Sequence, residues 1–353
     1  MKQGINGLTI ENQYFHWFEL EKFCENAIAG KTEPDWKMDV YRFILDFISD
    51  SAYILQQTSG STGTPKTIQL SKQAILKSAE NTIEFFNLGE NQKAVLCLPG
   101  KYIAGKMMIV RAFLAEMNLI LIEPASLPDF SNLGKIDFCA MVPMQAAKLL
   151  EQNKWPDIKA LILGGSETNP ELAEKLQSVE TEVFETYGMA ETCSHIALKR
   201  INGKNPEEYF TTLPGIKISL DNRDCLEIEA AFLNEKIITN DIVELVSENN
   251  FNWIGRFDTI INSGGIKIQP EILEKQTTDI LQKPCVILGK PDELLGQKVV
   301  LIIESEPEDP KIIFEKLAPF IDKKMLPKTI LFMKSLPRNK SFKIDRAALN
   351  RVI

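Results

Sequence analysis

The chain has 353 residues, of which 44% are hydrophobic and 25% are charged, and its formal net charge at pH 7 is −8. These values are typical of a globular protein with room for two domains. The acidic balance argues against a general nucleic-acid or membrane-surface binder, because both need basic faces. The sequence shows no apolar run of the ~20 residues that span a bilayer and no signal-peptide pattern, so we expect no membrane insertion.

The cysteines and histidines bear on redox chemistry and metal binding. The cysteines are scattered along the chain without the short spacings of zinc sites or redox pairs. We therefore predict single buried thiols and a reducing, cytoplasmic location. The two histidines, His16 and His195, argue against a histidine-rich metal site. The cysteines are Cys24, Cys97, Cys139, Cys193, Cys225 and Cys285.

Apolar strand-like runs alternate with helical patterns through the first part of the chain. A helix is expected over 71–88 with Ser71 as its N-cap, since apolar residues recur there every three or four positions. Another helix is expected from Asn169, with Pro170 at its first position. Short strands that are apolar throughout predict an α/β fold with sheets covered on both faces. The expected strands are 93–100, 118–123, 138–143, 159–165 and 181–188.

The pattern changes in the last part of the chain. From about residue 213 the sequence is β-rich, and a hairpin and a helix with Pro270 near its start follow. The final hundred residues alternate again between strands and helices, with a helix expected over 310–322. We therefore expect a large N-terminal domain over 1–255 and a small C-terminal α/β domain over 256–353.

The stretch QQTSGSTGTPKTIQLS, residues 56–71, is rich in glycine and hydroxyl side chains ahead of Lys66. Gly60 and Gly63 allow turns that direct backbone N–H groups at an anion, and the hydroxyls and Lys66 add donors and charge. A Walker-type phosphate loop needs a glycine before its Lys-Ser/Thr pair and a helix that starts there. Here Pro65 takes the place of that glycine and a strand-like segment follows, so the Walker interpretation fails.

The string TSGSTGTPK resembles the signature loop of the adenylate-forming superfamily, which contains acyl- and aryl-CoA synthetases, luciferases and peptide-synthetase adenylation domains. The resemblance implies a large N-terminal adenylation domain with mixed sheets and a partly β-rich distal part, followed by a small mobile C-terminal α/β domain. It also implies that the loop holds the phosphates of ATP and that Lys66 takes part in catalysis. The ATP-binding residues implied in the loop are Thr58, Ser59, Gly60, Ser61, Thr62 and Gly63.

Two further motifs resemble adenine-side segments of the superfamily. TYGMAET, residues 186–192, is similar to Y-G-x-T-E, with Ala190 in place of the usual threonine. The resemblance implies that Tyr187 stacks on adenine and that Glu191 helps to hold Mg²⁺, which takes oxygen ligands, on the phosphates. GGSET, residues 164–168, resembles the small-residue turn beside adenine. The ATP-binding residues implied here are Gly164, Gly165, Ser166, Glu185, Thr186, Tyr187 and Gly188.

Two more segments resemble the ribose and hinge motifs. TND, residues 239–241, is similar to T-G-D, which implies that Asp241 binds the ribose hydroxyls; Asn240 replaces the glycine. GRFDTIINSGGIKIQPEILE matches a long signature that makes Arg256 a ribose or phosphate contact and Asp258 the hinge. The residues that this signature turns toward CoA are Gly264, Gly265 and Lys267.

LPRNKSFKIDRAAL, residues 336–349, resembles the closing motif of the superfamily and makes Lys343 the catalytic lysine, with Phe342 in place of a glycine. By its residues alone, this stretch is also typical of a solvated basic tail or a nucleic-acid patch. The resemblance implies a two-step reaction: a carboxylate attacks the α-phosphate of ATP, and the thiol of coenzyme A then displaces AMP. Positive charge at the phosphates, from Mg²⁺, Lys66 and Lys343, lowers the barrier to the first step.

YGMAETCSHIAL and LPGKYIAGKMMIVRAFL are especially similar to segments of the o-succinylbenzoate–CoA ligases of menaquinone biosynthesis. This resemblance implies that Arg111 binds the second carboxylate of an aromatic dicarboxylate, with Lys101 and Met189 also in the acyl pocket. By its position alone, Arg111 is equally a helix-surface arginine. A CoA ligase for another aryl or fatty acid and a catalytically degenerate nucleotide-binding protein remain open, as does a homodimer.

Overall fold

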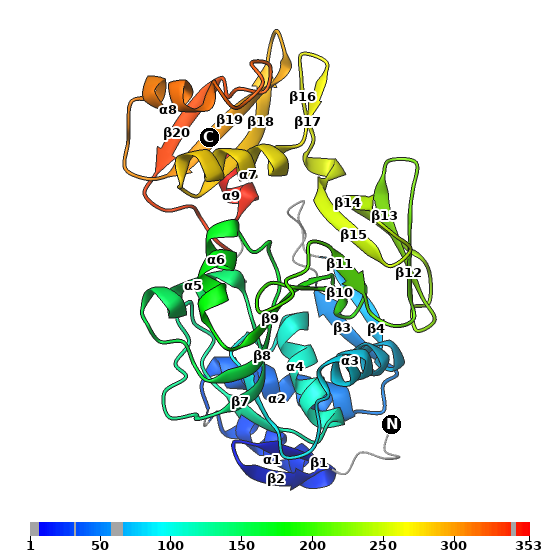
Figure 1. Ribbon diagram of the computed structural model, residues 1–353. Helices are drawn as coiled ribbons and strands as arrows, with labels where there is room; N and C mark the ends of the chain where they lie inside the picture. Colours follow the sequence, from blue (N-terminus) through cyan, green and yellow to red (C-terminus); the bar gives the residue numbers. More distant parts are fainter. Residues whose placement is uncertain (1–6, 32, 58–65, 340–343) are drawn as a thin grey trace. The chain divides into compact units, whose positions relative to one another are not determined.

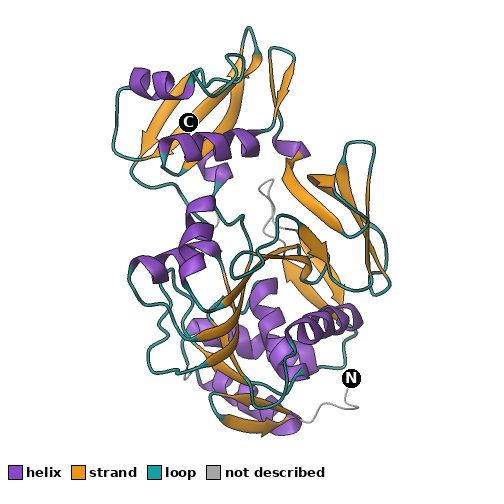
Figure 2. Cartoon of the chain, viewed as in Figure 1, coloured by secondary structure: helices purple, strands orange, loops and turns teal. Residues whose placement is uncertain are grey.

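The structure, a computed structural model, describes residues 7–31, 33–57, 66–339 and 344–353 (Figures 1 and 2). Its contacts group the chain into two compact units. Unit 1 comprises Met1–Ile216 and Glu229–Ile237, and unit 2 comprises Lys217–Ile228 and Ile238–Ile353. The boundary predicted between residues 255 and 256 rests on the proposed hinge at Asp258. That boundary therefore stays a prediction.

Unit 1 is built on a sheet whose central strands are parallel and ordered β9-β8-β7-β5-β6. Strand β1, parallel to β6, and then β2 extend the sheet at one side. Strands β10 and β11 continue it antiparallel beyond β9. The strands are β1 Gly7–Ile10, β2 Gln13–His16, β5 Lys93–Leu96, β6 Asn118–Leu121, β7 Ile136–Met141, β8 Ile158–Leu163, β9 Glu182–Gly188, β10 His195–Arg200 and β11 Phe210–Thr212.

Helices cover both faces of strands β7, β8 and β9 (Figure 1). Successive side chains of a strand point to opposite faces, so Cys139 and Val183 pack on one side in a cluster with residues of α5 and α6. Phe138 and Phe184 point to the other side, where the ring of Phe86 on α3 lies 5.1 and 5.2 Å from theirs. The helices of unit 1 are α1 Trp17–Gly30, α2 Asp35–Ile48, α3 Lys72–Phe86, α4 Ile103–Leu114, α5 Pro143–Glu151, α6 Pro170–Lys175 and the 3-10 turn η1 Leu176–Ser178.

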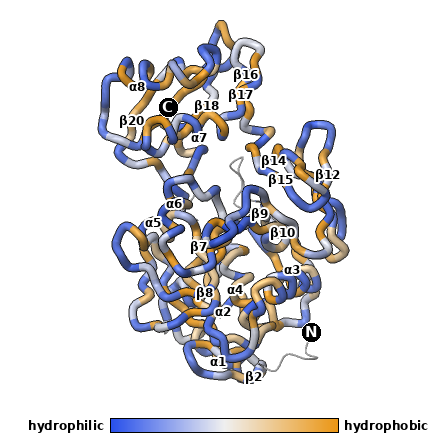
Figure 3. The backbone as a smooth tube through the Cα atoms, in the orientation of Figure 1, coloured by the Kyte–Doolittle hydropathy of each residue, from blue (hydrophilic) through white to orange (hydrophobic). Residues whose placement is uncertain are grey.

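This arrangement confirms the predicted α/β architecture and its doubly covered strands. Figure 3 shows the corresponding contrast along the chain, with mainly hydrophobic strands and mainly hydrophilic connections. Ligands of open α/β sheets bind at the carboxyl ends of the strands. In unit 1, β8 ends directly before Gly164, β9 ends with Gly188, and β5 ends shortly before Lys101. The hairpin of β3 Tyr53–Gln57 and β4 Thr67–Ser71 flanks residues 58–65.

Unit 2 contains two groups of strands. Strands β12 to β15 are neighbours in chain order, and β14 and β15 are antiparallel. The second sheet has the order β17-β16-β19-β18, with β20 parallel to β19, and its core includes Ile287, Leu301 and, from α8, Leu317. The elements are β12 Ile216–Leu220, β13 Cys225–Ala230, β14 Ile237–Leu245, β15 Asn250–Arg256, η2 Phe257–Thr259, β16 Ile261–Ser263, β17 Ile266–Ile268, α7 Pro270–Leu281, β18 Cys285–Asp292, β19 Gly296–Glu304, α8 Pro310–Leu317, β20 Thr329–Met333 and α9 Arg346–Val352.

Three local expectations about helix ends are confirmed and one is wrong. Asn169 caps α6 by accepting a 2.8 Å hydrogen bond from the third residue of the helix, and Pro270 begins α7. Ser71 is the N-cap residue of α3, as expected, although its side chain makes no capping hydrogen bond. The helix expected over 310–322 ends as α8 at Leu317. Pro319 explains that end, because helical backbone is disfavoured just before a proline.

The cysteines behave as the sequence predicts. All six are free and buried, and the Sγ atoms of Cys97 and Cys139 lie 3.9 Å apart on adjacent chain segments. In the part of the chain that the structure describes, no helix is both long and apolar enough to cross a membrane.

Candidate active site

The phosphate-loop residues 58–63 and the predicted catalytic Lys343 lie outside the described residues. Their roles therefore stay predictions. Lys66 is described and exposed, and it directly precedes β4. On either side of Lys343, Arg338 and Ile344 form an antiparallel bridge, and the N–H of Asp345 donates to the carbonyl of Pro337 at 2.8 Å.

The turn after β8 leaves no room for a side chain at its first residue. A Cβ atom added at Gly164 would lie 2.7 Å from the hydroxyl oxygen of Thr186 on β9. That hydroxyl donates to the carbonyl of Leu163 at 3.0 Å. Gly165 has a φ of +94°, which side chains rarely allow. Of the predicted adenine-side glycines, Gly164 therefore lies against Thr186, and the exposed Ser166 follows Gly165.

Glu185, a predicted ATP-binding residue on β9, is 2% exposed and holds the same turn. One carboxylate oxygen accepts a 2.6 Å hydrogen bond from the N–H of Thr168, and the other pairs with the ammonium group of Lys199 at 2.7 Å. Both oxygens thus have protein partners. A contact between Glu185 and a nucleotide stays a prediction.

The Y-G motif leads into a tight turn between β9 and β10. A Cβ atom added at Gly188 would lie 2.3 Å from the carbonyl oxygen of Ser194, so only glycine fits. The buried hydroxyl of Thr192 accepts from the N–H of Met189 at 3.0 Å and donates to the carbonyl of Ser194 at 2.6 Å. Tyr187 is half-buried, with its ring centroid 6.0 Å from that of Phe210.

Arg111 lies in the last turn of α4 and is 2% exposed. Its Nη2 donates to the hydroxyl of Ser194 at 2.6 Å, and its Nη1 points at the sulfur of Met108 at 3.9 Å. Its buried Nε has no hydrogen-bond partner, and no carboxylate pairs with the guanidinium among the described residues. Burial lowers the pKa of Arg111 to about 9, which still leaves the side chain protonated at neutral pH.

A buried guanidinium without a counter-ion is costly, because the protein returns little of the lost hydration energy. The partial negative charge at the carboxyl end of α4 offsets a small part of that cost. The site therefore fits an incoming anion. Lys101, the other predicted cation, is exposed, and its ammonium group lies 5.3 Å from the ring centre of Tyr102.

The described residues of unit 1 also fit a nucleotide with its metal ion. The turn at Gly164 and Gly165 presents bare backbone beside the strand that carries Tyr187. Glu191 is exposed, makes no ion pair in the described part of the chain, and offers the carboxylate oxygens that Mg²⁺ prefers. No group of three metal-binding side chains is found among the described residues, so the phosphates and water would complete the coordination.

In unit 2, the predicted ribose and hinge residues are joined. Asp241 on β14 faces Arg256 at the end of β15, with Asp241 Oδ1 3.4 Å from Arg256 Nη1. The same carboxylate oxygen accepts a 3.3 Å hydrogen bond from the indole of Trp253. Arg256 also donates two hydrogen bonds to Asp258, at 2.9 and 2.8 Å.

The predicted CoA-side glycines form the two-residue turn between β16 and β17. Gly264 and Gly265 have φ of +59° and +81°, which is the backbone of a tight hairpin turn that glycine favours. Lys267 follows on β17 and is exposed. Contacts of these residues with CoA stay predictions.

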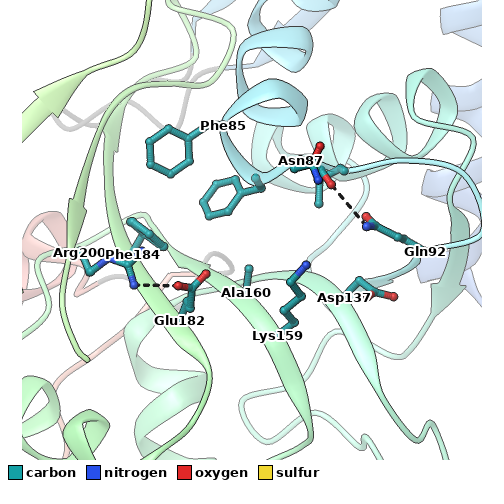
Figure 4. Close-up of a pocket in the computed structure, with 11 residues that line it drawn as sticks. Phe85, Asn87, Gln92, Asp137, Lys159, Ala160, Glu182, Phe184 and Arg200 are labelled. Carbon is teal, nitrogen blue, oxygen red and sulfur yellow. Dashed lines mark hydrogen bonds and ion pairs between the residues drawn. The ribbon is translucent and has the colours of Figure 1, made fainter. Parts of the chain in front are cut away.

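A pocket of about 250 Å³ in unit 1 lies at the other end of the parallel strands (Figure 4). Lys159 and Glu182, at the beginnings of β8 and β9, line it together with aromatic rings from α3. Arg200 closes one side and pairs with Glu182 at 3.0 Å. None of the predicted site residues that the structure describes lines this pocket, so it is separate from the part of the candidate active site described above.

The residues that the sequence did not reveal are those behind Arg111. Ser194 is 83 positions from Arg111, and its neighbour His195 contacts Thr82, 113 positions away. No spacing along the chain signals these contacts. The fold alone brings the residues together.

The family follows from the comparisons with known proteins. Residues 28–225, more than half of the chain, match the model of the AMP-binding enzyme family. A solved structure from Dyadobacter fermentans, an acyl-CoA synthetase (AMP-forming)/AMP-acid ligase II-like protein, is 32% identical with a TM-score of 0.60. The match covers 94% of this chain and 98% of that one. The chain therefore belongs to the AMP-binding enzyme family.

Two further proteins are similar over most of the chain. The 2-succinylbenzoate–CoA ligase of Lactococcus lactis is 24% identical over 329 residues, which cover 86% of this chain and 72% of that protein. The o-succinylbenzoate CoA synthetase of Bacillus subtilis, solved with its acyl-adenylate intermediate, has a TM-score of 0.77 at 18% identity. That match covers 99% of this chain and 96% of the other, and it shows that the two folds are alike.

Proposed function

We propose that this protein is an AMP-forming 2-succinylbenzoate–CoA ligase of menaquinone biosynthesis. The observation that carries the proposal is the buried Arg111, which has no carboxylate partner among the described residues and is hydrogen-bonded to Ser194 beside the Y-G motif. A substrate with two carboxylates supplies the missing negative charge with one of them and reacts through the other. The similarity to the Lactococcus lactis ligase supports this substrate class.

The first step joins the acid to AMP. An oxygen of the reacting carboxylate attacks the α-phosphorus of ATP, and the bond to the bridging oxygen of the β-phosphate breaks and releases pyrophosphate. We assign Lys343 to the charge that develops on the α-phosphate and Lys66 to the leaving phosphates. A bound Mg²⁺ would neutralise phosphate charge, with Glu191 as its protein ligand.

The second step transfers the acyl group. The thiol of coenzyme A loses its proton and attacks the carbonyl carbon, the new C–S bond forms, and AMP leaves. Because Lys343 has no role in this step, we propose that the small C-terminal domain rotates about Asp258 between the two reactions. Gly264, Gly265 and Lys267 are then the residues proposed to face CoA.

The test is thioester formation from ATP, Mg²⁺ and CoA with four acids: 2-succinylbenzoate, 4-oxo-4-phenylbutanoate, benzoate and a fatty acid. The second acid keeps the reacting carboxylate and lacks only the one on the ring. We expect turnover with 2-succinylbenzoate that depends on Lys343 and falls when the ring carboxylate is missing. Turnover confined to another acid would support the ligase activity and contradict the proposed substrate. ATP binding without any product would contradict the ligase activity itself.

A further inference from the structure

Arg111 is the first member of a buried chain of hydrogen bonds in unit 1. Its Nη2 donates to the Ser194 hydroxyl at 2.6 Å, and that hydroxyl lies 3.4 Å from Nδ1 of His195. Nε2 of the same imidazole lies 3.1 Å from the Thr82 hydroxyl, which donates to the carbonyl of Ser78 at 3.3 Å. Helices α3 and α4 and strand β10 thus meet around one imidazole ring.

Only one tautomer of His195 satisfies all of these hydrogen bonds. Ser194 accepts from Arg111, so its single hydrogen points to Nδ1, which must then be an acceptor. Nε2 carries the proton and donates to Thr82, whose own hydrogen is used on the α3 carbonyl. Every bond therefore donates in one direction, away from the guanidinium. A protonated ring would place a second cation next to Arg111 and leave the Ser194 hydrogen without its acceptor.

The residues of this hydrogen-bond chain are buried, which makes their arrangement rigid. Thr82 is 0% exposed and His195 is 7% exposed, so neither side chain has room to exchange its partner for bulk water. Among the described residues, Ser194 is the only oxygen acceptor that Arg111 meets, and Nη1 is directed at the sulfur of Met108. The buried Nε has no partner there, which leaves donor capacity for a ligand. A neutral histidine behind the serine thus fixes the guanidinium without cancelling its charge.

We infer that Ser194 and His195 are positioning residues that hold Arg111 for the second carboxylate of the substrate, and that they set the preference for a diacid over a monoacid. The inference rests on the proposed function and deepens it. Preorganisation of a charged group matters most for ligands that use it. The monoacid 4-oxo-4-phenylbutanoate, which lacks the ring carboxylate, is therefore the matched probe.

The experiment compares KM and kcat for 2-succinylbenzoate and for this monoacid in Ser194→Ala, His195→Leu and His195→Gln. Glutamine offers an acceptor to Ser194 and a donor to Thr82, as the neutral ring does. We expect Ser194→Ala and His195→Leu to raise KM for the diacid about tenfold, with the monoacid changed less than about twofold, and His195→Gln to restore most of the loss. Ser178→Ala and His16→Gln serve as matched controls at positions outside the site.

A second readout does not depend on turnover. Because the chain has only two histidines, imidazole ¹⁵N spectra of the wild type and His16→Gln assign His195, and we expect the Nε2–H tautomer. An Nδ1–H tautomer, equal effects on both acids, or a His195→Gln variant as impaired as His195→Leu would overturn the inference. Absence of 2-succinylbenzoate turnover in the wild type would instead overturn the proposed function, and the assignment of the second carboxylate would fall with it.

Discussion

Arg256 donates two parallel hydrogen bonds, of 2.9 and 2.8 Å, to the carboxylate of Asp258, two residues further along the chain. Its third nitrogen lies 3.4 Å from Asp241. The arginine therefore touches both the aspartate proposed for the ribose and the residue proposed as the hinge. In this conformation Asp258, the proposed hinge residue, therefore orients the Arg256 side chain, which is the proposed nucleotide contact.

The first prediction concerns Asp258→Ala. Without its carboxylate the Arg256 side chain loses two charge-assisted hydrogen bonds, while partial exposure to solvent limits their worth. We expect KM for ATP in pyrophosphate exchange to rise about threefold to tenfold, and Asp279→Ala, an exposed aspartate on α7, to change it little. An unchanged KM in Asp258→Ala would show that Arg256 does not need this partner.

The second prediction concerns Arg111→Met. Arg111 has no carboxylate partner among the described residues, so an apolar side chain of similar length removes a desolvation cost. Replacing whole buried ion pairs by apolar residues stabilises proteins by ~1–4 kcal/mol, and we expect an effect of this order. We expect a higher melting temperature, by about 2–4 °C per kcal/mol, together with loss of turnover of 2-succinylbenzoate. A lower melting temperature would mean that Arg111 is needed for folding.

The third prediction compares two glycines. At Gly188 an added Cβ atom would lie 2.3 Å from a backbone oxygen of the adjoining strand, whereas at Gly89 it would meet nothing within 4 Å. Gly188→Ala should therefore force β9 and β10 apart, at a cost of about 1–3 kcal/mol, and reduce adenylate formation. Chemical denaturation and pyrophosphate exchange check this. Equal behaviour of the two alanine variants would contradict it.

The fourth prediction concerns the pH dependence of stability. Burial and then the charge of Arg111 lower the pKa of His195 well below its ordinary value of 6.5, while its other contacts, Ser194 and Thr82, are uncharged. Between these two pKa values the unfolded chain binds more protons than the folded one, so stability is lost as pH falls below 6.5. His195→Gln should remove this slope, which is at most about 1.4 kcal/mol per pH unit.

The control for that slope is His16→Gln, which leaves His195 in place. The comparison is the free energy of unfolding of the wild type, His195→Gln and His16→Gln, measured by urea denaturation at several pH values from 6.5 downward. If the wild type and His195→Gln lose stability in parallel on acidification, His195 is not the group responsible.

Much of the fold is predictable from the sequence, for physical reasons that particular elements illustrate. Apart from Asp137 and Lys159 near their beginnings, strands β7 and β8 are buried on both faces and apolar, and the runs 138–143 and 159–165 mark them closely. Asn169 and Pro170 mark the start of α6 because the cap is local chemistry. The sequence pattern extends past the end of α8 because buried apolar residues continue to Ile321, although Pro319 signals the end of the helix.

The site divides in the same way. The turn at Gly164 and the Y-G motif lie at the ends of strands, where a short segment of sequence carries its own geometry. The contact between Arg111 and Ser194 depends instead on how α4 packs beneath the β9–β10 turn, which no local pattern encodes. Thr82 is the extreme case, because on α3 it resembles any other helix residue until His195 is placed against it.

The lack of a carboxylate beside Arg111 among the described residues also offers a way to find the substrate without measuring turnover. An acid that enters and supplies the anion stabilises the folded chain by mass action, by ~2.7 kcal/mol at a hundred times its dissociation constant. A thermal-shift screen of carboxylates would therefore rank ligands by how much their binding beside Arg111 raises the melting temperature. Acids without a reactive second carboxylate would register as clearly as true substrates, so the screen reads recognition apart from reaction.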